Sequence, residues 1–103
     1  MLTAQQKVLL HEQFFTTNQM GQKVQKSFGL ESLQEASSVF KKLLQDVEEL
    51  KEGDNIVGFQ FKDSEVEFTA DETVFIRKLL EGIKEATPNH YEVLLALKEM
   101  FKK

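Results

Sequence analysis

The side chains best suited to chemistry in this chain of 103 residues are two histidines and a run of acids. His11 and His90 lie far apart in the sequence, and the position four residues after His11 holds Phe15 instead of the second histidine of a zinc-binding helix. A histidine without a ligand partner is ordinarily a solvated or partly covered side chain. We therefore interpret both histidines as surface or boundary residues and predict no metal site.

The acids crowd into one short stretch that resembles a calcium loop only in composition. They are Asp63, Glu65, Glu67, Asp71 and Glu72. The stretch lacks the odd-position ligands and the central glycine that a calcium hand needs. Alternation along a strand accounts for Glu65 and Glu67, and capping of a helix accounts for Asp71 and Glu72. A solvated acidic face is the better interpretation, and we expect no cofactor.

Covalent catalysis has no recognisable motif in this chain. No serine lies in a Gly-x-Ser-x-Gly elbow, and none of the five glycines belongs to a phosphate-cradling loop. The absence of cysteine excludes disulfides and thiolate metal sites. Any two of the 17 carboxylates could still meet as an acid–base pair, but so small a chain has little room for a deep pocket. We predict a protein that is not an enzyme and has no small-molecule ligand.

The charge distribution argues against a nucleic-acid-binding protein. Residues 1–28 carry Lys7, Lys23 and Lys26 against Glu12, whereas the rest of the chain is acidic and the whole has a net charge of −4. The chain holds a single arginine, Arg77, although recognition of phosphates and bases relies strongly on arginine. A nucleic-acid-associated regulator that uses the basic N-terminal helix is the alternative interpretation.

The aromatic content suggests protein binding instead. The chain has nine phenylalanines and one tyrosine, and core packing is the default explanation for them. We expect that a domain of this size does not bury them all. The candidate protein-binding residues are the hairpin set Phe59, Phe61, Val66 and Phe68, together with Phe14 and Phe15 of the first helix.

A central helix over residues 32–52 is the strongest structural signal. Ser32 and Glu35 have the spacing of a capping box, and Gly53-Asp54-Asn55 supplies the stop. Apolar residues recur at alternating spacings of three and four, which places them on one helical stripe. They are Leu33, Ala36, Phe40, Leu43, Val47 and Leu50.

Three further helices are predicted from their caps. Thr3 with Gln6 opens the first, which we predict to run to about Phe28, either straight or kinked. The alternative is a break near Thr16, Thr17, Asn18 and Gly21, which are all poor helix formers. Thr69 with Glu72 opens another that ends near Ala86. Thr87-Pro88 starts the last helix, which closes on Lys102 and Lys103.

Between these helices the apolar period changes to two, which predicts a β-hairpin. Ile56–Lys62 and Glu65–Thr69 both alternate around Asp63-Ser64, so Phe61 would face Val66 and Phe59 would face Phe68. An isolated two-stranded hairpin is only marginally stable. It must either pack on the helices or pair an edge with a second copy of the chain, and the second option predicts self-association.

Together these patterns predict a mainly α (α+β) fold over residues 1–103, a single domain. The order is α-α-β-β-α-α, a compact helical bundle of four helices with a central hairpin. The predicted function is a small non-enzymatic protein-interaction module, an accessory or adaptor protein whose partners include a second copy of itself. In general character the chain is similar to small accessory proteins of phages and other mobile elements. The N-terminus lacks a signal peptide pattern and no apolar run could span a membrane, so we expect a cytoplasmic protein.

Overall fold

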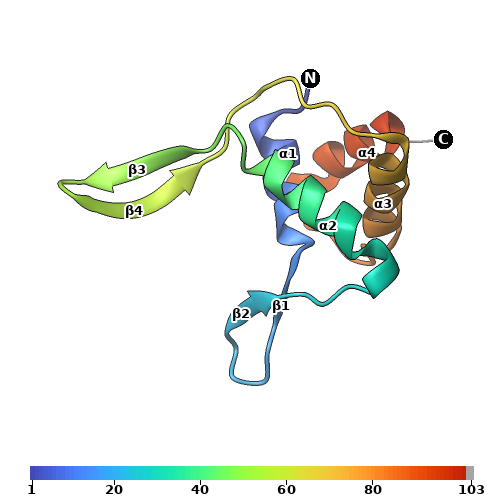
Figure 1. Ribbon diagram of the computed structural model, residues 1–103, viewed down its shortest axis with the longest axis horizontal. Coiled ribbons are helices and arrows are strands. Elements are labelled where there is room, and N and C mark those ends of the chain that lie inside the picture. Colours follow the sequence, from blue (N-terminus) through green and yellow to red (C-terminus); the bar gives the residue numbers. More distant parts are fainter. Residues whose placement is uncertain (102–103) are drawn as a thin grey trace.

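The chain folds into four α-helices and two separate two-stranded antiparallel sheets, as the computed structural model of residues 1–101 shows (Figure 1). The α+β class is confirmed, but the predicted order with one central hairpin is wrong, because the elements run α-β-β-α-β-β-α-α. Their bounds are α1 Ala4–Glu12, β1 Phe15–Thr17, β2 Lys23–Gln25, α2 Leu30–Leu43, β3 Glu48–Glu52, β4 Asn55–Gln60, α3 Ala70–Glu81, the short 3-10 helix η1 Pro88–His90, and α4 Tyr91–Met100.

The helices pack into one body around an apolar core (Figure 1). α1 contacts α2 and α4, and α3 also contacts α2 and α4. Leu10 of α1, Val39 of α2, Ile76 of α3 and Leu97 of α4 are fully buried in this core. Figure 1 shows that both hairpins extend from the body instead of covering it, and the longest dimension of the molecule, 46 Å, runs along the β3–β4 hairpin.

Two of the predicted capping boxes are confirmed. In α1 the N–H of Gln6 donates to Thr3 Oγ1 (3.1 Å) and the N–H of Thr3 donates to Gln6 Oε1 (2.9 Å). Thr69 and Glu72 make the same reciprocal pair at the start of α3. These boxes form because both partners lie within one turn of backbone and need nothing from the rest of the fold.

The long first helix is wrong, and the chain breaks as the alternative predicted, but the helix ends before the expected position near Thr16. α1 ends at Glu12, and the chain turns at residues 18–22 to pair β1 with β2. Asn18 Oδ1 accepts hydrogen bonds from the N–H groups of Met20 and Gln22, both at 2.9 Å, and Gly21 has a φ of +79°. A side chain that satisfies the turn's own backbone competes with the helix, and glycine adopts positive φ without strain.

The central helix over residues 32–52 is also wrong in its bounds. α2 starts after Gly29, so the predicted box of Ser32 and Glu35 does not form, and it ends at Leu43. Residues 48–52 become strand β3 and pair with β4 across Gly53-Asp54. Gly53 has a φ of +64°, as the first central residue of a type II′ hairpin turn requires. The glycine predicted to stop a helix therefore closes a hairpin.

The predicted partner of β4 is also wrong, because β4 pairs with the strand before it. Phe59 lies opposite Glu49 instead of Phe68, and no strand forms over residues 65–69. Ser64, predicted to lie in the turn, exchanges two backbone hydrogen bonds with Leu2 (2.9 and 3.0 Å). The segment after β4 is thus held on the N-terminus of the chain instead of folding back on β4.

The C-terminal elements differ from prediction mainly at their ends. α3 ends at Glu81, capped by Gly82, instead of near Ala86. Thr87-Pro88 does start the last helical segment, first as η1 and then as α4. The predicted closure on Lys102 and Lys103 lies outside the described residues.

Glu72, which is only 4% exposed, links α3 to α2 through its side chain. Oε1 accepts from Lys42 Nζ of α2 (2.6 Å) and from the N–H of Thr69 (2.7 Å), and Oε2 accepts from Ser38 of α2. Burial by itself would raise the pKa of Glu72, but these hydrogen bonds outweigh it and lower the pKa from 4.5 to about 2. The carboxylate stays charged because both helices supply donors to it.

Replacing Glu72 should weaken the α2–α3 contact. We expect Glu72→Gln to lower the free energy of unfolding by about 2 kcal/mol, because Lys42 loses its partner in a partly buried site. Urea denaturation followed by circular dichroism measures the change. Glu81→Gln, at an exposed position of the same helix, is the matched control. Equal losses of unfolding free energy in the two variants would contradict a specific role of Glu72 in the α2–α3 contact.

The same carboxylate predicts a loss of stability in acid. Its folded pKa, about 2, lies below the reference value of 4.5, so its contribution is complete above pH 4.5 and disappears as the pH falls towards 2. A shift of this size corresponds to on the order of 3 kcal/mol. We expect the stability difference between the wild type and Glu72→Gln to shrink over this range in urea titrations. A difference that stays constant down to pH 2 would show that the charge is not responsible.

Candidate protein-interaction surface

The six predicted binding residues do not share one surface. Phe14 is buried in the core (4% exposed), and its ring lies 5.2 Å from that of Phe40 and 5.6 Å from that of Phe28. Val66 and Phe68 are half-buried against the core, the latter edge-on to Phe101 at 5.8 Å. Of the six, only Phe59 is exposed, at 62%.

Phe15 and Phe61 belong to an aromatic cluster around His11. Their ring centroids lie 4.9 and 5.3 Å from the imidazole, and the ring of Phe40 stacks on it at 5.3 Å. Burial lowers the pKa of His11 from 6.5, Glu12 opposes this by raising it, and Lys23 adds to the lowering. His11 therefore packs as a neutral ring, which agrees with the boundary position that we expected.

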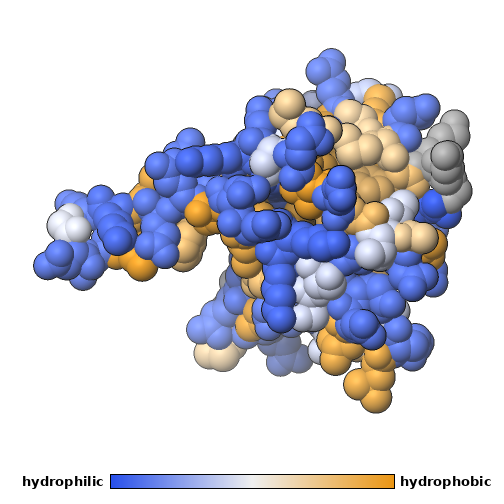
Figure 2. Space-filling model, turned by 45° about the horizontal axis from the view of Figure 1, so that its top comes forward, coloured by the Kyte–Doolittle hydropathy of each residue, from blue (hydrophilic) through white to orange (hydrophobic). Residues whose placement is uncertain are grey.

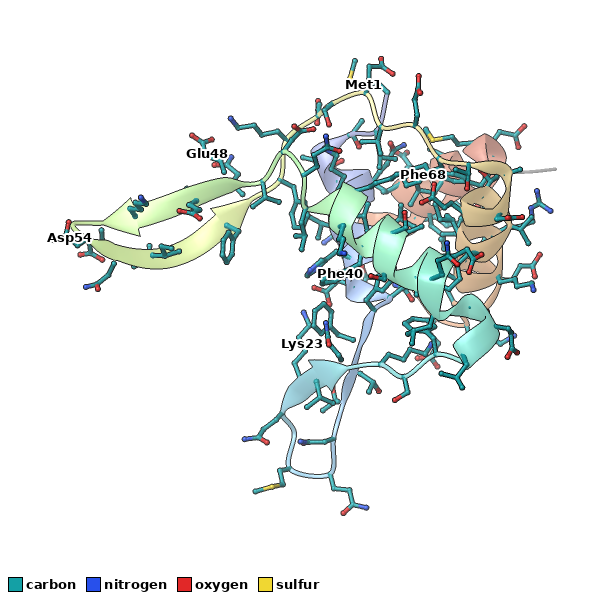
Figure 3. All side chains as sticks on the ribbon, in the orientation of Figure 1. Met1, Lys23, Phe40, Glu48, Asp54 and Phe68 are labelled. Atoms are coloured by element: carbon teal, nitrogen blue, oxygen red, sulfur yellow. The ribbon has the colours of Figure 1, made fainter. Side chains whose placement is uncertain are left out.

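The main exposed apolar surface near Phe59 is the β3–β4 hairpin, residues 48–60, which we call the arm. All residues of β3 are exposed, as are all of β4 except the half-buried Gly58. The exposed apolar side chains are Leu50 (43%), Ile56 (52%), Val57 (61%) and Phe59 (62%). Figure 3 shows the arm extending away from the helices, with Glu48 towards its base and Asp54 at its tip. Figure 2 shows apolar patches among its hydrophilic residues.

The register of the arm places two of these side chains on one face. Phe59 lies opposite Glu49 and Ile56 lies opposite Lys51, and residues 49 and 51 share a face of β3. Lys51 and Glu49 form an exposed ion pair across that face (3.9 Å). Leu50 occupies the other face, beside Gly58. The arm thus has an apolar patch of Ile56 and Phe59 with charged neighbours.

A groove lies where the arm joins the body. Its volume is about 470 Å³, and it is lined on one side by Phe59 and Phe61 and on the other by Val8 of α1 and Val93 of α4, with Gln5 and His90 at hand for hydrogen bonds. Apolar walls with a few polar groups suit the side chains of a protein partner. The groove makes the apolar surface of the arm continuous with the helical body.

The three lysines of the nucleic-acid alternative do not form an open basic patch. Lys7 is 1% exposed, and its Nζ donates to Ser64 Oγ at 2.6 Å. Lys23 pairs with Glu12 at 2.8 Å, and Lys26 lies 5.9 Å above the ring of Phe28.

No group of three or more His, Asp or Glu side chains within residues 1–101 is placed to hold a metal ion. Within the same residues, no helix has the length and apolarity needed to cross a membrane.

Comparison with known proteins adds no family: neither a family model, nor a curated protein, nor a solved structure matches the chain. The exposure and geometry of the candidate surface are therefore the only support for a binding role. Sequence reasoning identified Phe59 but missed Ile56 and Val57 as members of the surface. The available signal was the adjacent apolar pair Ile56-Val57, because neighbouring strand residues point to opposite faces and one buried face cannot cover both.

His11 predicts a second effect of pH on stability. Its folded pKa lies below 6.5, so protonation favours the unfolded chain, and stability is complete above pH 6.5 and falls as the pH drops below it. We expect His11→Gln to remove this dependence in urea titrations. His90→Gln, at an exposed position, should retain it. Loss of the dependence in the His90 variant instead would refute the role of the aromatic cluster.

Proposed function

We propose that this protein is a small non-enzymatic interaction module that self-associates through the arm and acts as an accessory or adaptor protein. One observation carries the proposal: the arm exposes Ile56, Val57 and Phe59 to solvent while its strands pair only with each other among the described residues. The helical body has its own core and can act as the scaffold that presents the arm.

The energetics favour a partner on the arm. A hairpin of two strands is only marginally stable in water, and no third strand among residues 1–101 pairs with either outer edge of this one. Burial of a whole Ile, Val or Phe side chain contributes about 1.5–3 kcal/mol, so covering these half-exposed residues would contribute roughly 1 kcal/mol each. The groove beside Phe59 and Phe61 offers further apolar area next to the arm.

The expected interface is modest. The arm is short, and stable interfaces ordinarily bury at least about 1,000 Å². We therefore expect an assembly whose extent depends on protein concentration.

The test is the solution mass, measured by light scattering over a concentration series. We expect the wild type to approach twice the chain mass of 11.9 kDa as concentration rises, and the double variant Ile56→Ser, Phe59→Ser to stay monomeric. Both substituted side chains point into solvent, so the helical circular dichroism signal should be unchanged. Phe61 is left intact because it packs on His11.

The matched control is the double variant Tyr91→Ser, Leu95→Ser. These residues are also exposed (58% and 48%) but lie on α4. The control should associate as the wild type does. A wild type that is monomeric at every concentration, or association that survives the arm variant and disappears in the control, would overturn the proposal.

A further inference from the structure

The two edges of the arm differ in charge. β3 reads Glu-Glu-Leu-Lys-Glu, so four of its five side chains are charged, whereas β4, Asn-Ile-Val-Gly-Phe-Gln, has no charged residue. Charged side chains on an edge strand discourage pairing with another strand, and an uncharged edge lacks that protection. Two β3 edges side by side would also place glutamates of both copies together, which is unfavourable. The edge open to another strand is therefore β4.

The irregularity of β4 indicates which strand fits it. Leu50 pairs with Gly58 and Lys51 pairs with Ile56, so Val57 is an extra residue without a partner on β3. A regular strand added to β4 would have to accommodate this bulge. A second copy of β4 carries the same extra residue at the same place. An antiparallel pair centred on Val57 sets one extra residue opposite the other, and the register continues on both sides.

We infer that β4 pairs with β4 of a second copy across a two-fold axis at Val57, forming a four-stranded sheet in which the two β3 strands are outermost. This inference rests on the proposed self-association and specifies its geometry. The pairing satisfies the open backbone groups of β4 in the way that strand addition does.

The remaining features of the arm agree with this arrangement. Ile56 and Phe59 share one face, so a two-fold axis perpendicular to the sheet joins the apolar patches of both copies on that face. The two acidic β3 strands lie three strand spacings apart, about 14 Å. This exceeds the Debye length of about 8 Å at physiological ionic strength, so their repulsion is largely screened.

The absence of cysteine from the sequence allows a direct test with single introduced cysteines. A disulfide needs Cα atoms roughly 4.4–6.8 Å apart, which adjacent strands provide and strands about 14 Å apart do not. Under mild oxidation we expect Val57→Cys to form a covalent dimer at least about tenfold faster than Leu50→Cys. Leu50 is the matched position, because it is an exposed apolar residue of the same arm on β3.

The outcomes separate this inference from the proposed function. Preferential cross-linking at position 57 supports the β4 pairing. If the wild type is dimeric by light scattering but cross-linking occurs only at position 50, equally at both, or at neither, the pairing is overturned and self-association stands. A wild type that is monomeric at every concentration overturns both.

Discussion

The structure depends first on a carboxylate that is buried and still charged. Glu72 caps the first turn of α3 and also accepts hydrogen bonds from Lys42 and Ser38 of α2, so separating the two helices would leave its charge unmatched. Lys42 Nζ also donates to the carbonyl oxygen of Glu67 (2.9 Å), which ties the segment before α3 to α2. The Lys42–Glu72 ion pair thereby orients α2 and α3 together with the segment that leads into α3.

The contacts made by the segment after β4 explain why the arm points away from the body. The segment that follows β4 is held at Phe61 by the ring of His11, at Ser64 by Leu2 and Lys7, and at Glu67 by Lys42. With residues 61–67 anchored on the helices, β4 cannot pair with that segment. Its partner is the strand before it, and the resulting hairpin extends beyond the anchor points into solvent (Figure 1).

The sequence predicted the features that depend on neighbouring residues and failed on those that depend on distant ones. The caps at Thr3 and Thr69 are complete within one turn, so their chemistry is readable. Residues 48–52 consist of good helix formers whose apolar spacing continues that of α2, and only their pairing with β4 makes them a strand. Phe59 was identified as a surface candidate from its strand position, whereas burial of Phe14 depends on rings from α2 and α3. No local pattern reports that difference.

The separation of arm and body has an evolutionary consequence. Among the described residues, the buried core and the apolar side chains packed on it include none from residues 48–60. Mutations in the arm are therefore free of the selection that maintains a folded core, and a new partner can be acquired by changing a few strand residues while the scaffold is inherited intact. Descendants of such a chain would diverge fastest in the hairpin and keep the helices as their common signature.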